Sequence, residues 1–171
     1  MGVRIRGTLT ALRPATALDV DLLVGWHADP EVARYWGDKT FTPDQMRTRL
    51  RRRDVDGYIV EVDDEPIGYV QAWQGHDRTG GVDMFLIPGA RGQGYGPDAA
   101  RALARYLRER EGWTRITTDP YVWNDGAVRA WERAGFRPVE ERPEDEEHTA
   151  PWLLMVFDLR DPKGQTKGFD P

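Results

Sequence analysis

The sequence predicts a mixed α/β (α+β) fold, and three observations support this class. Strand-like segments, with apolar residues at alternate positions, are interleaved with helix-like segments, whose apolar residues recur at helical spacing. Residues 58–62 and 67–73 flank a turn of charged residues and proline, which predicts an antiparallel hairpin. The apolar segment 82–88 leads through a glycine-rich loop into a helical pattern over residues 97–111, which predicts a strand followed by a helix.

The length predicts one domain. With 171 residues, 39% of them hydrophobic, the chain is long enough to bury a core of ordinary size. No internal repeat or low-complexity linker divides it. We therefore expect a single domain over residues 1–160, followed by a loose polar tail over residues 161–171 that contains Gly and Pro.

The first elements are a strand and two helical segments. Residues 8–13 alternate and include β-branched side chains, which favours a short strand. Thr16 has the side chain of a helix N-cap, and apolar residues then recur at helical spacing over residues 18–26. A further helical turn is expected over residues 32–36, where Gly37 stops it.

A basic helix and the hairpin follow. Thr42 precedes a proline at the first helical position, so a helix is expected to begin there and to continue through the arginines of residues 51–53, which we interpret as a solvated helix end. The hairpin strands come next, and residues 74–81 are predicted to form a polar loop before the strand over 82–88.

The second half of the chain alternates strands and helices. The helix over residues 97–111 has one apolar face. A helix over 124–134 is expected to end at Gly135, which suits a left-handed C-terminal cap. The remaining elements are strands over 113–118, from 136 to 139 and over 152–159, and an acidic loop over 140–149.

Composition excludes several classes of function. The formal net charge is −5 and the pI about 5.3, which argues against a nucleic-acid partner and weakly favours a cationic small substrate. The chain has 0 cysteines, so disulfides, thiolate zinc sites and Cys nucleophiles are ruled out. Neither a membrane-spanning segment nor an N-terminal signal-peptide core is present, so we expect a cytoplasmic protein without membrane partners.

A glycine loop follows the apolar strand and is typical of a phosphate site. Glycines let the backbone approach a phosphate closely, and the helix that follows adds its unpaired N–H groups and the positive end of its dipole. The spacing does not fit a Rossmann fingerprint or a P-loop, whereas an ordinary strand-to-helix turn stays open as an alternative. The residues predicted to bind the phosphates are Arg91, Gly92, Gln93, Gly94, Tyr95 and Gly96.

Together with a second segment, this loop resembles the acyl-CoA-binding core of the GNAT N-acetyltransferase superfamily. Arg91-x-x-Gly94-x-Gly96 is similar to the pyrophosphate loop of that family, and Asn124-x-x-Ala127 with its Gly-Phe ending is similar to the second cofactor segment. The resemblance implies a GNAT fold, with a mixed, mostly antiparallel twisted sheet of about six to seven strands and about four flanking helices. It also implies that strands 82–88 and 113–119 splay apart around the thioester of acetyl-CoA.

The resemblance is closest to the aminoglycoside 6'-N-acetyltransferases. It rests on the Tyr-Trp-Gly ending of residues 31–37, the hairpin segment 65–71, the Gly-Val-Asp strand entry at 81–83 and Thr-Asp-Pro at 118–120. The implied substrates are acetyl-CoA and a primary amine of a small polycationic acceptor. The alternatives are a lysine-derived siderophore precursor or a protein amine as acceptor, or a non-catalytic acyl-CoA-binding module.

Asp83, the lone carboxylate in its apolar strand, is the candidate general base. An amine must lose a proton before it attacks a thioester, and a nearby carboxylate can bind the ammonium and take that proton. The alternative is a solvent-facing or ion-paired strand residue. Asp119, at the end of the next strand, is expected to bind a second ammonium, or else to form an Asx turn before Pro120.

Other site residues follow from the resemblance. Backbone N–H groups of Met84, Phe85 and Leu86 are expected to hold the thioester carbonyl. Asn124 and Ala127 are assigned to the pantetheine arm, and Asn124 is also a helix N-cap. Trp131 is expected to pack on the cofactor, or else to belong to the core. It stands where many family members have the Tyr that protonates the thiolate, and an indole N–H is not a usable acid. The acid therefore stays open between Tyr121, Tyr95 and water.

Aromatic residues are expected to wall the acceptor cleft, although each is equally suited to a core. They are Tyr35, Trp36, Trp73 and Tyr121, with Trp123 as a further candidate. The acidic run over 140–147 is interpreted as a solvated loop that would attract a cationic acceptor at most. The three histidines are scattered, so no metal site is expected. The sequence is compatible with a monomer or a homodimer.

Overall fold

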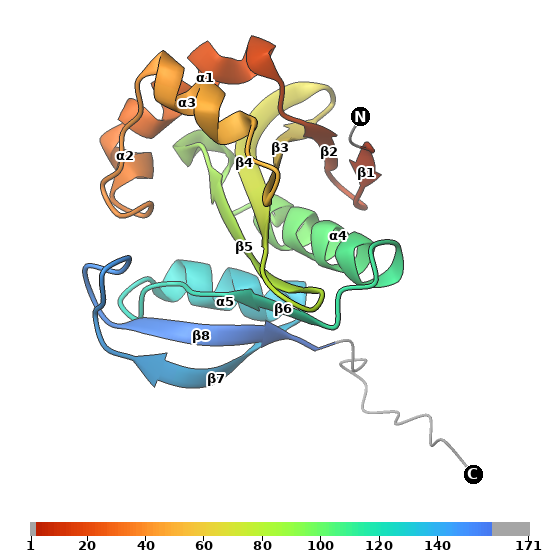
Figure 1. The fold of residues 1–171 in the computed structure, drawn as a ribbon, viewed down its shortest axis with the longest axis vertical. Helices are drawn as coiled ribbons and strands as arrows, with labels where there is room; N and C mark the ends of the chain where they lie inside the picture. Colours follow the sequence, from red (N-terminus) through yellow and green to blue (C-terminus); the bar gives the residue numbers. More distant parts are fainter. Residues whose placement is uncertain (1–2, 159–171) are drawn as a thin grey trace.

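A computed structural model describes residues 3–158 and shows one twisted sheet with helices on both faces (Figure 1). The described residues form eight strands in the order β1-β2-β3-β4-β5-β6-β8-β7. Every neighbouring pair is antiparallel except β5 and β6, which are parallel. The strands are β1 Ile5–Arg6, β2 Ala11–Pro14, β3 Val55–Val62, β4 Glu65–Gln74, β5 Thr79–Leu86, β6 Arg115–Thr118, β7 Phe136–Arg142 and β8 Trp152–Phe157.

The helices divide between the two faces of this sheet. Those of the N-terminal half, α1 to α3, pack on one face, and α4 and α5 pack on the other. Their bounds are α1 Val20–Ala28, α2 Pro30–Ala33, α3 Pro43–Leu50, α4 Tyr95–Glu109 and α5 Asp125–Ala134, with short 3-10 turns at Ala17–Asp19 and Pro88–Ala90. No helix of residues 3–158 is long and apolar enough to cross a membrane.

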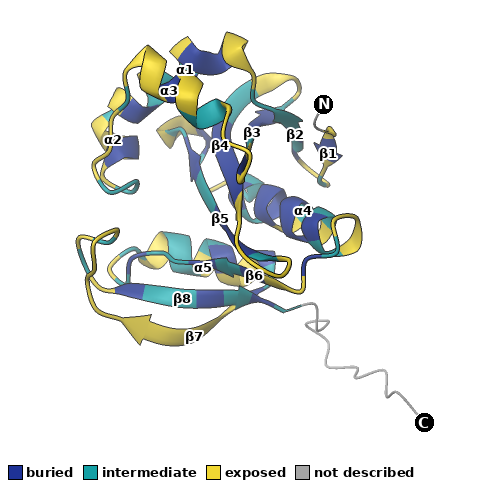
Figure 2. Cartoon of the chain, viewed as in Figure 1, coloured by how far each residue is buried: buried dark blue, intermediate teal, exposed yellow. Residues whose placement is uncertain are grey.

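Because side chains alternate between the two faces of a strand, neighbouring residues of one strand lie in two different cores. Tyr58 and Val60 of β3 belong to the cluster under α4 and α5, whereas Ile59 between them belongs to the cluster under α1 to α3. Successive side chains of a strand point to opposite faces, so a strand covered on both sides is apolar throughout. Figure 2 shows the result, with the central strands buried and the edge strand β7 exposed along most of its length.

The two parallel strands part where the site is expected. β5 and β6 pair only between Thr79–Gly81 and Arg115–Thr117, and β5 then continues through Leu86 without β6 beside it. Beyond the pairing, β6 is bonded to β8 instead. In Figure 1, β3 to β5 and the group β6, β8 and β7 accordingly fan away from each other. The predicted splay of the central strands is confirmed.

The predicted fold class is confirmed, and several boundaries differ. The sheet has eight strands among the described residues, against about six to seven expected. The prediction missed β1 because this strand is only 2 residues long, too short to leave a periodic signal. The predicted polar loop over 74–81 is confirmed only for residues 75–78, since Gln74 ends β4 and Thr79 to Gly81 already form the start of β5. β7 extends through Arg142, so Glu140 and Glu141 are strand residues rather than loop residues. The predicted tail over 161–171 lies outside the described residues.

Local caps follow the sequence closely. Thr42 and Gln45 form a reciprocal capping box at the start of α3, and Asn124 caps α5 by accepting a hydrogen bond from Ala127 N–H at 3.1 Å. Gly135 ends α5 in the left-handed region, with φ +108°. Each cap satisfies helix-end groups that have no partner within the helix. α3 ends at Leu50, so residues 51–53 lie beyond it.

His27 of α1 is a buried histidine without a hydrogen bond. Its side chain is 0% exposed, and neither ring nitrogen has a partner among the described residues. The ring packs edge-on against Trp36, Phe41 and Phe85. Burial in this apolar box, with the nearby Arg49 as a second cause, lowers the pKa of His27 to about 4. The imidazole is therefore neutral and uncompensated in the folded protein.

Replacing His27 with Leu is expected to raise the free energy of unfolding at pH 7 by about 1–3 kcal/mol, because two buried polar atoms are removed. The unfolded chain takes up a proton on His27 below about pH 6.5, whereas the folded protein does so only near pH 4. The wild type should therefore lose about 3 kcal/mol between those pH values, and the variant should lose less. Urea unfolding at pH 7, 5.5 and 4 measures both effects. The exposed His76, changed to Leu, is the matched control, and equal acid sensitivity in all three proteins would contradict the assignment.

Candidate functional site

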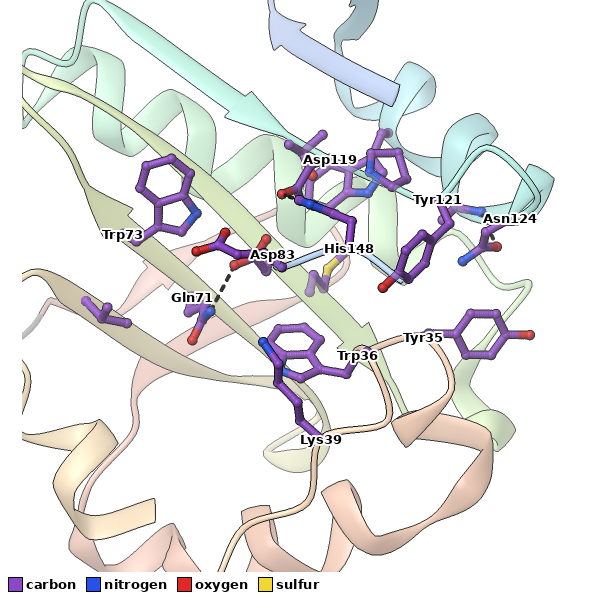
Figure 3. Close-up of a pocket in the computed structure, with 18 of the residues that line it drawn as sticks. Tyr35, Trp36, Lys39, Gln71, Trp73, Asp83, Asp119, Tyr121, Asn124 and His148 are labelled. Atoms are coloured by element: carbon purple, nitrogen blue, oxygen red, sulfur yellow. Dashed lines mark hydrogen bonds and ion pairs between the residues drawn. The ribbon is translucent and has the colours of Figure 1, made fainter. Parts of the chain in front are cut away.

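A pocket of about 460 Å³ lies beside the point where β5 and β6 part (Figure 3). It is lined from both halves of the molecule, by the segment after α2, the strands β4 and β5, the end of β6, the start of α5 and the loop before β8. The predicted site residues that line it are Tyr35, Trp36, Trp73, Asp83, Met84, Asp119, Tyr121, Asn124, Ala127 and Trp131. Most of the predicted chemistry therefore converges on one cavity.

Asp83 is held by a chain of polar side chains across the sheet. Gln71 lies directly opposite Asp83 in the β4–β5 register and donates from Nε2 to Asp83 Oδ2 at 2.9 Å. Arg49 of α3 donates from Nη2 to Gln71 Oε1 at 2.9 Å, which fixes the amide so that its NH₂ group faces Asp83. One carboxylate oxygen of Asp83 is thereby oriented, and the side chain still lines the pocket.

The environment of Asp83 favours its protonated form. Burial, and after it the neighbouring Asp119, raises the pKa of this carboxyl group to about 7, against the opposing hydrogen bond from Gln71. A group whose pKa lies near the working pH is well suited to both take up and release a proton. Asp83 therefore has the electrostatic setting of a general base and not of a permanently ionised surface carboxylate.

Asp119 joins a cluster that the sequence did not reveal. His148, in the loop before β8, lies with Nε2 2.9 Å from Asp119 Oδ2 and with Nδ1 2.8 Å from Asp145 Oδ1. Figure 3 shows Asp119 and His148 near Asp83, between Trp73 on one side and Tyr121 on the other. The acidic loop thus contributes Glu147 and His148 to the pocket lining, whereas Asp145 is exposed, so the solvated-loop interpretation holds for most of the run but is incomplete.

Three of the lining residues were not assigned to the site from the sequence, for different reasons. Gln71 is a polar residue in an apolar strand, 4% exposed, and that signal was as visible in the sequence as the one at Asp83. His148 gave no such signal, because it lies 29 residues from Asp119 in an acidic stretch that resembles a solvated loop. Arg52 also lines the pocket, where it pairs with Asp54 at 2.6 Å, so it is more than the solvated helix end that we expected.

Stacked aromatic rings span the two sides of the cleft. Tyr121 stacks on Trp123 with ring centroids 5.6 Å apart and planes at 12°. Tyr35 approaches the same Trp123 ring, also with centroids 5.6 Å apart. Trp36 lines the pocket and also belongs to the packing beneath it, where its ring lies edge-on to Phe85 with centroids 5.4 Å apart. Trp73 lies over Gly81, where any larger side chain would overlap its indole ring.

The charges that line the pocket balance. The acidic residues are Asp54, Asp83, Asp119 and Glu147, and the basic ones are Lys39, Arg49, Arg52 and His148. The net charge of −5 over the whole chain therefore does not extend to this cavity. What distinguishes it is the placement of two carboxylates, Asp83 and Asp119, next to each other at the point where the strands part.

The glycine loop lies between β5 and α4 and has the geometry of an anion site. Gly92 and Gly94 have φ +76° and +83°, which favour glycine, and Gly94 is the N-cap of α4 without a side-chain cap. A Cβ at Gly92 would meet nothing within 4 Å, so the loop is open on that side. The N-terminal amides of a 15-residue helix are thus available to a phosphate group.

Not every predicted cofactor residue has a free side chain. Arg91 donates from Nε to Leu86 C=O at 3.1 Å and from Nη2 to Glu31 C=O at 2.7 Å, so its guanidinium braces the loop against α2. Phe85 and Leu86 are 5% and 9% exposed and point into the cores, so only their backbone groups can serve a ligand. Gly96 packs over Met84 and Leu86 at the base of α4.

The second cofactor segment lies at the far wall of the pocket. Asn124 uses Oδ1 for its cap, which leaves its NH₂ group for a ligand. Trp131 is 6% exposed and packs edge-on against Phe136 with centroids 5.0 Å apart, so it combines a core role with a place in the pocket lining. Among residues 3–158 no cluster of three or more acidic, His or Cys side chains suits a metal ion.

The fold and the site together define an acyltransferase that works on a phosphate-bearing acyl carrier. A sheet whose parallel pair splays beside a glycine loop, with a carboxylate in the opening, has the parts to hold a thioester and to deprotonate an amine. The family model of the acetyltransferase (GNAT) domain matches residues 10–137, and the chain belongs to this family. It is an acetyl-CoA-dependent N-acetyltransferase. The alternative of a non-catalytic acyl-CoA-binding module is therefore set aside.

Known proteins show which relatives share this architecture. The chain is 30% identical to aminoglycoside N(6')-acetyltransferase type 1 of Klebsiella pneumoniae over 145 residues, which cover 73% of this chain and 72% of that protein. The structure of AAC(6')-Ib with paromomycin and acetyl-CoA superposes with a TM-score of 0.76 at 26% identity, covering 87% and 93% of the two chains. Spermidine N-acetyltransferase of Vibrio cholerae shares the fold at TM-score 0.77 and 16% identity, covering 88% and 95%.

Proposed function

We propose that this enzyme transfers the acetyl group of acetyl-CoA to a primary amine of a small polycationic acceptor, namely the 6'-amine of an aminoglycoside. The observation that carries the proposal is the pair of carboxylates, Asp83 and Asp119, inside the pocket where β5 and β6 part. Two adjacent carboxylates suit an acceptor that presents more than one ammonium group. The likeness to aminoglycoside N(6')-acetyltransferase type 1 supports the choice of acceptor.

Asp83 performs the proton transfer in this proposal. Its carboxylate binds the acceptor ammonium, takes one proton from it directly or through a water, and leaves a neutral amine facing the thioester. The C–N bond then forms as the C–S bond breaks, and the proton balance closes when the released thiolate is protonated. Gln71 and Arg49 keep Asp83 in one orientation throughout.

The backbone of β5 and the glycine loop hold the donor. In this proposal, N–H groups around Met84, where β5 runs on without β6, stabilise the developing oxyanion, and the loop amides at the start of α4 hold the pyrophosphate; the end of the β5–β6 pairing supports this. Trp131 cannot supply the thiolate with a proton, since an indole N–H is not acidic. Tyr121 brings a phenol into the pocket, where its oxygen lies 3.4 Å from Thr149 Oγ1.

The proposal is tested by thiol release from acetyl-CoA with a panel of amines. The panel contains matched aminoglycosides that carry either a 6'-amine or a 6'-hydroxyl, together with spermidine, a lysine-derived hydroxamate precursor and a lysine peptide. We expect turnover with the 6'-amines and at least a 100-fold lower kcat/KM with the 6'-hydroxyl partners, on the order of the loss when the reacting group is removed. Turnover of another amine class without any 6'-amino aminoglycoside would overturn the acceptor assignment.

A further inference from the structure

His148 is the one imidazole in the described structure that bonds to two carboxylates. Its Nε2 lies 2.9 Å from Asp119 Oδ2 and its Nδ1 lies 2.8 Å from Asp145 Oδ1. A neutral imidazole carries a single N–H, whereas a carboxylate only accepts hydrogen bonds. Both contacts are satisfied together when both ring nitrogens carry hydrogen, which means that the ring carries a positive charge.

The imidazole ring is fixed from several sides. It stacks on Trp152 with centroids 4.3 Å apart and planes at 16°, and the ring of Tyr121 meets it edge-on at 6.2 Å. Asp145 also accepts the backbone N–H groups of Glu147 and His148 and the Trp152 indole N–H at 3.1 Å. The loop before β8 is thus folded around Asp145 so that it presents His148 to the end of β6.

Charged and titratable groups surround this ring on each element that packs against it. They are Asp119 at the end of β6, Tyr121 after it, Asp145 and Glu147 in its own loop, Arg142 over the Trp152 ring at 5.3 Å, and Asp83 of β5 beyond Asp119. The carboxylates outnumber the cations here. The positive charge of His148 therefore meets a net negative surrounding, in keeping with a pKa that the bonds to Asp119 and Asp145 raise to about 9.

We propose that His148 is a positioning residue of the transfer reaction: its positive charge holds Asp119 beside Asp83 and offsets the repulsion between these two carboxylates. Asp119 raises the pKa of Asp83, so the charge on Asp119 is felt at the base. A cation on the far side of Asp119 reduces that effect and keeps the ionised, proton-accepting form of Asp83 available at lower pH. This role rests on the proposed function of Asp83.

The test compares His148→Ala and His148→Gln with the wild type. Glutamine can keep an N–H donor near the position of Nε2 but carries no charge. For both variants we expect the acid limb of the kcat/KM pH profile to move up by about one pH unit, as when an opposite charge is lost near a carboxyl group. At pH 7 kcat/KM should fall about 5- to 10-fold, because less Asp83 is ionised. The exposed His76, changed to Ala, should leave the profile unchanged.

The direction of each result decides between charge and structure. If glutamine restores the wild-type profile, the contact is structural and the proposal is overturned, and the same holds if alanine leaves the acid limb within about 0.2 pH unit. The ¹³C carboxyl titration of Asp83 in the free enzyme measures the same shift without an acceptor. If no amine is acetylated, the proposed function fails, and this titration still shows whether His148 acts on Asp83.

Discussion

Replacing Asp83 with Asn is expected to lower kcat/KM for the acceptor by about 10²- to 10⁴-fold, the usual range for loss of a general base. The amide keeps the shape of the side chain and can still pair with Gln71, so the strand should be undisturbed. It cannot take a proton, and it no longer attracts the acceptor ammonium, so kcat should fall and the KM for the acceptor should rise.

The pH profile separates the two contributions of Asp83. Because its pKa is raised to about 7, the ionised form increases as the pH rises through that value, and wild-type kcat/KM should rise with it. The variant should lose this limb. Affinity for acetyl-CoA, measured by calorimetry, should stay the same, since the glycine loop is a separate part of the structure.

A matched variant controls for the removal of one negative charge. Asp77 lies in the exposed turn before β5, in the left-handed region at φ 54°, which Asn tolerates as well as Asp. Asp77→Asn should therefore retain wild-type activity. If Asp83→Asn keeps kcat/KM within about threefold of the wild type, the proton is taken by another group, since a general base contributes far more than this.

Replacing Asp98 with Ala is expected to destabilise the protein by about 3 kcal/mol or more, because several donors lose their acceptor together. Asp98 lies in the first turn of α4 and is 9% exposed. Its carboxylate accepts the N–H groups of Thr8, Leu9 and Thr10 at 2.9–3.0 Å and the hydroxyl of Thr10 at 2.7 Å. One side chain thereby ties the turn between β1 and β2 to the helix that follows the glycine loop.

Thermal unfolding measures this effect, and the midpoint should fall by roughly 6–12 °C in a chain of this size. The control is Glu109→Ala, in the exposed last turn of α4, and its stability should stay within about 0.5 kcal/mol of the wild type.

Burial raises the pKa of Asp98, but the hydrogen bonds from Thr10, Leu9 and Thr8 outweigh burial and hold that pKa below its usual value. The stabilisation should therefore be complete above about pH 4 and lost as the pH falls through the lowered pKa. Equal midpoints for the Asp98 and Glu109 variants would contradict this account.

The sequence alone determined what depends on neighbours in the chain. The caps at Thr42, Asn124 and Gly135 formed where predicted because they join groups within a single helical turn. The glycine loop was visible because the positive φ values at Gly92 and Gly94 favour glycine over other residues. Asp83 was visible as the one carboxylate in an apolar strand, because burying a charge there is costly and so points to a function.

The tertiary structure decided which side chains meet across the chain. Gln71 reaches Asp83 only because the β4–β5 register places them opposite each other. His148 reaches Asp119 because the loop before β8 folds around Asp145, and Asp98 holds a turn 88 to 90 residues before it. These contacts depend on strand register, loop conformation and burial, which no local pattern records. Hydrophobic periodicity repeats along the sequence and so predicts the elements, whereas each polar contact of the site occurs once and is set by how those elements pack.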